Sequence, residues 1–219
     1  MTPPGRFGLD IHNNYVFSGR STPQYPGEQP PDRVYRLTPE FYYGMSDKFE
    51  LGTYLLTTRA SAGDVHFDGA KLRLKFIAPH DAARGALWGL NLEIGYTDAH
   101  VSAYPWNVEL KGITGYRAQH WLLAANLNID RSFSRTGAAT AELDTKFARE
   151  IGHSSQVGVE LYDELGRASS PGPLNEFSQT ICTVLDTQLG GFDINAGLGW
   201  GLTPSSDHAV FKLIVGRHF

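Results

Sequence analysis

The sequence of 219 residues predicts an all-β protein, namely a transmembrane, up-and-down antiparallel β-barrel of about twelve strands that forms a single domain over residues 1–219. Three observations lead to this prediction. Apolar and polar residues alternate with a period of two, longer and shorter connections alternate along the chain, and one face of the alternating segments is densely charged.

Segment 70–76 shows the alternation plainly, because Leu72, Leu74 and Phe76 share one face while the residues between them are basic. A period of two is the side-chain period of a strand with two different faces. Twelve such segments follow one another along the chain, at 6–18, 33–44, 48–59, 66–77, 87–97, 107–117, 120–130, 138–149, 155–164, 176–188, 191–202 and 208–219.

The connections between these segments predict how the strands pair. The odd-numbered connections are mostly longer and rich in Pro, Ser and Gly, as at 19–32 and 165–176. The even-numbered connections are mostly short, as at 44–47 and 189–191, and short connections suit hairpin turns. A meander with loops on one rim and turns on the other gives this rhythm.

Alternation alone leaves open which face points outward, since a soluble barrel and a membrane barrel place the apolar stripe on opposite sides. A closed barrel of about eight strands can be filled by its own side chains, and each further strand widens the interior. Twelve strands with an apolar interior would have to collapse or hold a large ligand. A polar interior can hold water. We therefore expect a polar lumen lined by Arg36, Glu40, Glu50, Lys71, Arg73, Lys75, Glu93, Glu109, Lys111, Asp130 and Lys212.

The aromatic residues support the same orientation. They gather near the ends of the predicted strands on the apolar stripe, where amphipathic rings favour a membrane–water boundary. Aromatic residues also suit strands in general, so their shared placement carries the argument. The rings in question are Tyr15, Phe17, Tyr35, Tyr43, Phe49, Phe76, Trp88, Tyr96, Tyr116, Trp121, Phe192, Trp200 and Phe219.

A sheet crosses lipid only when it closes without an edge, and single-chain bacterial barrels use even strand numbers. Twelve segments fit that rule, and ten or fourteen strands are the alternative counts. The segment 208–219 should then pair with 7–17 and close the barrel. A soluble β-sandwich or β-barrel that binds an apolar ligand is the alternative architecture.

Four stretches resemble Gram-negative outer-membrane channels of the transporter group named for the MetA pathway of phenol degradation. They are "LTPEFYYGMSDKFELGTYL" (37–55), "GAKLRLKF" (69–76), "WGLNLEIGYT" (88–97) and "HAVFKLIVGRHF" (208–219). The last stretch is also similar to the C-terminal signal that the outer-membrane insertion machinery reads, with Phe219 at its end and Arg217 as one departure. The resemblance implies a channel in the cell outer membrane for small organic or hydrophobic solutes.

Composition excludes several other classes. The net charge of −4 and the lack of a basic run with stacking aromatics argue against nucleic-acid binding. Cys182 is the only cysteine, and the eight histidines show no zinc spacing, so neither a metal nor a cofactor is expected. The first ten residues lack the pattern of a signal peptide, so this is either a protein that is not exported or a mature or truncated form.

We therefore expect a passive channel with lipid and a small solute as its partners. Lys71, Arg73 and Lys75 stand about 6.6 Å apart on one polar face, where they either attract anions or are neutralised by Glu93, Glu109 and other acids. Loops 19–32 and 165–176 are the expected constrictions. The alternative function is a lipid-modifying enzyme, with His153, Ser154 and Ser155 as the nearest catalytic candidates, but no acid partner is evident and we expect no enzyme.

Overall fold

The computed structural model describes residues 1–81, 84–135, 137–152 and 154–219. Its strands are β1 (Phe7–Ser18), β2 (Tyr35–Gly44), β3 (Phe49–Arg59), β4 (Val65–Ile77), β5 (Gly85–Thr97), β6 (Trp106–Ala118), β7 (Trp121–Ser132), β8 (Thr140–Glu150), β9 (Ser155–Arg167), β10 (Ser170–Pro171), β11 (Gln179–Leu189), β12 (Phe192–Gly201) and β13 (Ala209–His218). A single 3₁₀ turn, η1 (Leu174–Glu176), is the only helical element among the described residues. No described helix is long and apolar enough to cross a membrane.

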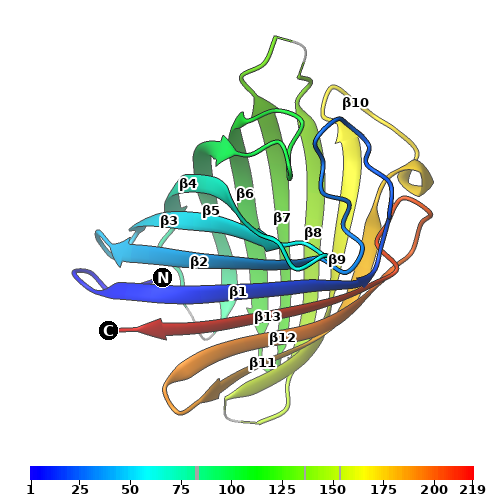
Figure 1. Ribbon diagram of the computed structural model, residues 1–219. Coiled ribbons are helices and arrows are strands. Elements are labelled where there is room, and N and C mark those ends of the chain that lie inside the picture. The colour runs from blue at the N-terminus through cyan, green and yellow to red at the C-terminus, as the bar shows by residue number, and fades with distance from the viewer. Residues whose placement is uncertain (82–83, 136, 153) are drawn as a thin grey trace.

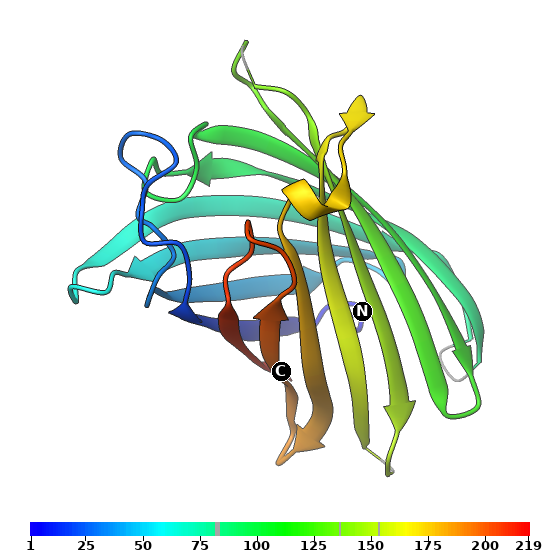
Figure 2. The same cartoon turned by 90° about the vertical axis from the view of Figure 1, so that its right-hand side faces the viewer.

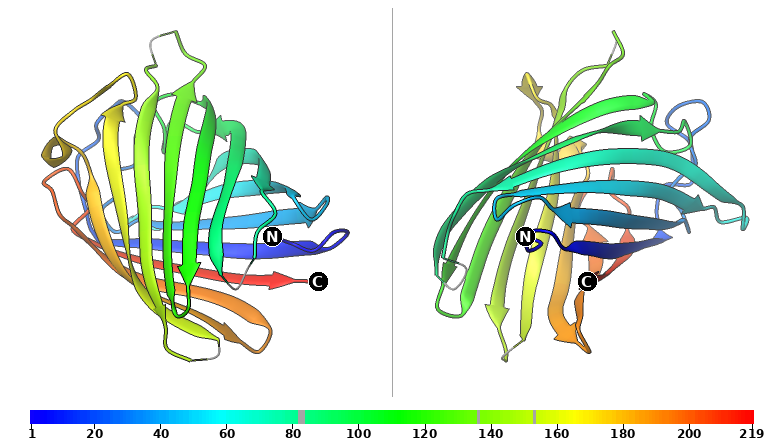
Figure 3. Two further views of the ribbon diagram at one scale, coloured as in Figure 1. Left: turned by 180° about the vertical axis from the view of Figure 1, so that it is seen from behind. Right: turned by 90° about the vertical axis from the view of Figure 1, so that its left-hand side faces the viewer.

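Twelve long antiparallel strands form one closed sheet, in which each strand pairs with the next along the chain and β13 pairs with β1. The two-residue β10 is an addition at the edge of β9. In Figure 1, β1–β3 and β13 in front cross β6–β9 behind, and Figure 3 shows the same crossing from the back. Crossing of this kind follows from strands that tilt strongly against the barrel axis.

The predicted fold class is confirmed, and every predicted strand boundary lies within three residues of the observed one. The largest differences are at β9, which runs on to Arg167, and at β11, which begins only at Gln179. β9 is longer because its last residues still pair with β8, beyond a register shift at Ala141 and Glu142. Phe177, predicted to lie in a strand, lies in the loop before β11 instead.

The closing seam joins the two ends of the chain. Ile11 pairs with Val215 in the middle of the β1–β13 ladder, and the backbones of Phe7 and Phe219 exchange two hydrogen bonds at its end. Both termini therefore lie at the rim that carries the short turns, while the longer loops gather at the opposite rim (Figures 1 and 2). The predicted pairing of the first and last segments is confirmed.

The apolar stripe faces outward. On β5, Leu90, Leu92 and Ile94 are more than two-fifths exposed, whereas Asn91 and Glu93 between them are buried. The same inversion of a soluble protein's pattern is expected when the surroundings are lipid and the interior is wet. The orientation predicted from the polar stripe is the one observed.

Aromatic rings pack against one another on this outer face near the strand ends. At the turn rim Phe49, Phe76 and Trp88 form a chain of contacts with ring centroids 5.1 and 5.5 Å apart. At the loop rim Tyr96 and Trp106 lie 5.7 Å apart. These two groups have the placement of the aromatic girdles of membrane barrels.

Two polar residues on the outer face have specific partners. Asn13, near the middle of β1, donates to the carbonyls of Ile11 and Leu213 and accepts a hydrogen bond from the Tyr35 hydroxyl, so its amide is satisfied within the sheet. Arg217, the departure from the C-terminal pattern, lies at the turn rim with its guanidinium 5.2 Å from the centre of the Phe192 ring. A long basic side chain is well tolerated at such a boundary.

Candidate functional site: a polar lumen with two unlike walls

The inward face of β1–β4 carries a dense set of ion pairs, which we call the paired wall: Asp10, His12, Glu40, Glu50, Arg73 and Lys75. Arg73 on β4 is its centre. Its guanidinium lies 2.8 Å from Glu40 on β2 and also bonds Glu50 on β3, and all three side chains are at most 5% exposed. Lys75 reaches Glu50 at 3.3 Å, and Thr2 donates to the same carboxylate through its backbone and its hydroxyl.

Each of the three basic residues of β4, Lys71, Arg73 and Lys75, has a carboxylate partner. Arg73 and Lys75 are taken up by Glu50 and Glu40, and Lys71 lies 4.0 Å from Glu93. A buried charge that is paired contributes little field outside its pair. Of the two roles that the sequence allows for Lys71, Arg73 and Lys75, the geometry favours mutual neutralisation with the acids over an anion-attracting ladder.

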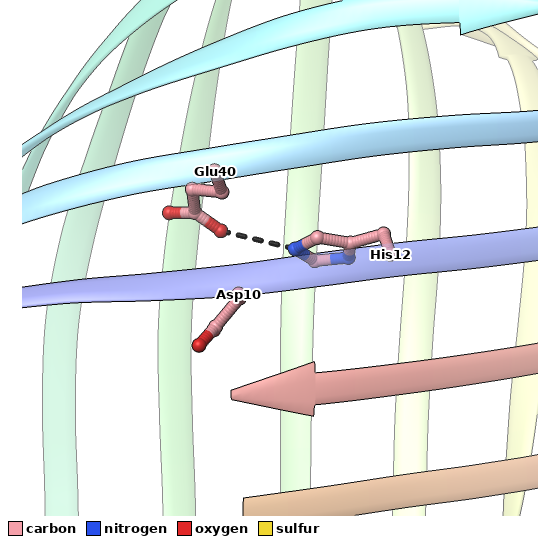
Figure 4. A group of neighbouring side chains, drawn as sticks. All are labelled: Asp10, His12 and Glu40. Carbon is pink, nitrogen blue, oxygen red and sulfur yellow. Dashed lines mark hydrogen bonds and ion pairs between the residues drawn. The ribbon is translucent and has the colours of Figure 1, made fainter. Parts of the chain in front are cut away.

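Asp10, His12 and Glu40 are the group in the described chain that could hold a metal, because their ligand atoms lie within 4.8 Å of one another. Figure 4 shows His12 facing Glu40 across β1 and β2, and the two side chains are joined by a 3.1 Å hydrogen bond. The donor set suits Zn²⁺. The Arg73 guanidinium already lies on Glu40, so a metal ion would have to share that carboxylate with a cation.

A second set of ion pairs, the Glu160 cluster, consists of Lys146, Glu160, Tyr162, Asp186 and Lys212. Lys146 on β8 lies 3.0 Å from Glu160 on β9 and 2.7 Å from Asp186 on β11. Lys212 on β13 bonds both Glu160 and the Tyr162 hydroxyl. Because β11 and β12 stand between β9 and β13, these contacts cut across the curve of the wall and occupy lumen space.

The loop-side half of β6–β9 is different, and we call its inward residues the acidic wall: Glu109, Asp130, Glu142, Asp144 and Glu164. Here carboxylates stand directly opposite carboxylates, since Glu109 pairs in register with Asp130 on one side and with Glu93 on the other. Glu142 likewise stands opposite Glu164. Like charges directly opposite on neighbouring strands are destabilising.

Few cations compensate the acidic wall. Glu109 lies 3.4 Å from Lys111, and Asp130 accepts a 2.9 Å hydrogen bond from the Asn107 amide. Within the described ranges, neither Asp130, Glu142, Asp144 nor Glu164 has an ion pair with lysine or arginine. The two halves of the lumen therefore differ in charge balance.

Two cavities lie along the lumen. The larger, of about 940 Å³, opens at the turn rim and is lined by Asp10, Glu150, Gln156, Asp186 and Asn195 among others. The smaller, of about 310 Å³, lies at the loop end against the acidic wall. Residues of the Glu160 cluster lie between these two levels of β8 and β9, which makes the cluster the candidate constriction.

The loop rim is held by its own contacts. Arg20 donates two hydrogen bonds, of 3.0 and 2.7 Å, to the Glu28 carboxylate, and Gln29 donates through its backbone to the carbonyl of His100 in another loop. The hydrogen bonds from Arg20 lower the pKa of Glu28. Loop 19–32, an expected constriction, is thus tied to the loop rim.

The structure brings together charged side chains from strands that do not pair with each other, which the sequence does not indicate. Arg73 and Glu40 meet across β3, and Lys212 meets Glu160 across two strands, where the curvature of the closed barrel shortens the gap. Arg36 lies on the inward face near the loop rim, outside both clusters. His12, Glu164 and Phe177 escaped the sequence prediction of the lining, and for Glu164 the continued register with β8 was the missing signal.

Two of the three candidate catalytic residues, Ser154 and Ser155, lie in the described part of the chain. His153 lies outside the described residues. The Ser155 hydroxyl shares a 2.8 Å hydrogen bond with the Thr187 hydroxyl, and Ser154 lines the larger cavity.

Comparison with solved structures finds the same architecture over the whole chain. The COG4313 outer membrane channel from Pseudomonas putida F1 superposes with a TM-score of 0.68 at 12% identity, covering 100% of this chain and 97% of that one. The fold is that of outer-membrane channels. The KdgM porin gives a TM-score of 0.63 at 9% identity over 97% of this chain and 99% of its own, and the NanC porin gives 0.60 at 10% identity over 95% and 97%. No family model and no curated protein sequence matches this chain.

Proposed function

We propose that this protein is a passive channel of the bacterial outer membrane for small polar solutes. One observation carries the proposal, namely that the closed barrel is apolar outside and surrounds polar cavities of about 940 and 310 Å³. Such a lumen suits water and hydrophilic solutes. The overall likeness to channel and porin structures supports it.

The residues predicted to line the pore take distinct roles in this proposal. Arg73, Glu40, Glu50 and Lys75 brace one side of the lumen, while Glu109, Asp130 and the other members of the acidic wall set the charge that a solute meets. The Glu160 cluster narrows the path between the cavities. Because the uncompensated charge is negative, the channel should prefer cations.

We also propose a class of solute and an insertion signal for this channel. The resemblance to the transporter group of phenol degradation suggests small organic solutes, and the polar lumen favours those that carry polar or charged groups. The C-terminal strand, ending in the exposed ring of Phe219, is proposed as the segment read by the insertion machinery.

Liposome swelling tests the proposal. Proteoliposomes that hold the full chain should swell in isosmotic solutions of small sugars and amino acids, at rates that fall with solute size. Empty liposomes, and liposomes with the chain denatured before reconstitution, give the baseline. Swelling no faster than this baseline for every solute would overturn the channel.

A further inference from the structure

The smaller cavity, at the loop end of the lumen, has the features of a binding site for an organic cation. Its volume of about 310 Å³ is at the low end of small-molecule pockets. Carboxylates of Glu109, Asp130, Glu142 and Glu164 line it, and Phe177 from the loop before β11 closes one side. Glu164 is the exposed member of this group.

Three of the four carboxylates that line this cavity lack an ion pair in the described part of the chain. Only Glu109 has a lysine within ion-pair distance. Lys71 acts on Asp130 from further away and lies 4.0 Å from Glu93. Neighbouring carboxylates that stand opposite one another without cations are stabilised when a bound cation enters between them.

A second, independent feature is the Asn128 side chain, which lines the cavity and is 6% exposed. Its amide nitrogen donates a 2.8 Å hydrogen bond to Asp144, which fixes the amide orientation because a carboxylate only accepts. Its oxygen is buried and has no hydrogen-bond partner among the described residues. A buried acceptor without a donor is costly, so the site calls for a ligand that brings an N–H or O–H group.

Phe177 adds an apolar face whose position is built into the backbone. Gly166 has φ of +74°, and a Cβ atom there would lie 2.3 Å from the Phe177 ring, so glycine is needed for both the conformation and the contact. The ring can pack against a carbon chain or the face of a cation. A bare metal ion would make no use of it.

We propose that this cavity binds a small organic cation with primary ammonium groups, such as a short diamine. Ammonium N–H groups donate to the carboxylates and to the free oxygen of Asn128, while the carbon chain packs on Phe177. The inference deepens the proposed function, on which it rests, by naming a class of solute that the channel takes from the loop side.

Calorimetric titration of the detergent-solubilised full chain with 1,4-diaminobutane tests the site. We expect saturable binding, none with the neutral 1,4-butanediol, and at least a tenfold loss of affinity in the Glu142→Gln/Glu164→Gln double variant and in Asn128→Leu. Glu176→Gln is the matched control, because it removes an exposed carboxylate beside Phe177 that does not line the cavity. It should bind as the wild type does.

Three results would overturn the site: no saturable heat in the wild type, an equal loss in Glu176→Gln, or Mg²⁺ alone binding more tightly than the diamine. Each variant is first checked for the heat-dependent gel mobility of a folded barrel. Salt conductance in planar bilayers is measured in parallel. Normal conductance without diamine binding would contradict the binding site but not the channel. Diamine binding without conductance would contradict the channel.

Discussion

The two walls of the lumen arrange their inward charges in opposite ways. In the paired wall Arg73 stands between Glu40 and Glu50, so each buried charge has a partner of opposite sign. In the acidic wall Glu109 faces Asp130 and Glu142 faces Glu164, so like charges are neighbours. The first arrangement stabilises the barrel, and the second leaves a negative surface for a solute. Position in the lumen thus separates charges that hold the structure from charges that can act on what passes.

The largest effect is expected from removing the centre of the paired wall. Arg73→Met leaves Glu40 and Glu50 buried without their guanidinium, which should lower the free energy of unfolding by about 3–5 kcal/mol. Urea unfolding in detergent measures it. Arg131→Met, the same change at an exposed position, is the control. Equal stability of the two variants would show that the paired wall does not brace the barrel.

Neutralising the acidic wall should change selectivity more than stability. In the Asp130→Asn/Glu142→Gln double variant, the permeability of K⁺ relative to Cl⁻ should fall several-fold, because the remaining lumen charges are largely paired. Reversal potentials across a KCl gradient measure this ratio. An unchanged ratio would mean that the acidic wall does not face the conducting path.

Removing a single carboxylate of the acidic wall should have a smaller effect, and it should increase the stability of the barrel. Glu142→Gln removes one of two directly opposed carboxylates and should raise the free energy of unfolding by about 0.2–1 kcal/mol. Glu160→Gln, on the neighbouring strand, should lower it, since Lys146 and Lys212 lose their partner. If both variants lose stability alike, the two walls do not differ in the way described.

The smallest effect concerns the partly buried pair Arg20 and Glu28 at the loop rim. The pKa of Glu28 is lowered by Arg20, so the contribution of this pair is present at neutral pH and is lost as the pH falls through the lowered pKa. Backbone hydrogen exchange of residues 20–32, corrected for the intrinsic rate, should show protection at neutral pH that is lost as acid protonates Glu28. Glu28→Gln should lack that protection at neutral pH. Protection that changes neither with pH nor in Glu28→Gln would exclude the Arg20–Glu28 pair as the contact that holds this loop.

The alternation of residues such as Leu72 and Arg73 was enough to predict the strands and which face is wet, because the period of two is a local property. The partners of Arg73 could not be predicted in the same way. Its register neighbour on β5 is Glu93, yet its long side chain lies over Gly52 and bonds Glu50, a diagonal neighbour on β3, and Glu40 on β2.

The acidic wall shows the same limit. Glu109 and Asp130 were expected on the lumen face, but their direct opposition depends on the register between β6 and β7. Phe177 was expected in a strand because it falls within the predicted segment 176–188. The absence of a Cβ atom at Gly166 instead leaves room for its ring in the loop.

The most direct test of the account is the reversal potential of the wild-type chain in a planar bilayer with a KCl gradient. A wet lumen with a neutralised paired wall and an uncompensated acidic wall predicts stable single-channel currents. It also predicts a reversal potential shifted from zero toward the equilibrium potential of K⁺. A barrel that inserts and carries no current, or one that prefers Cl⁻, would contradict it.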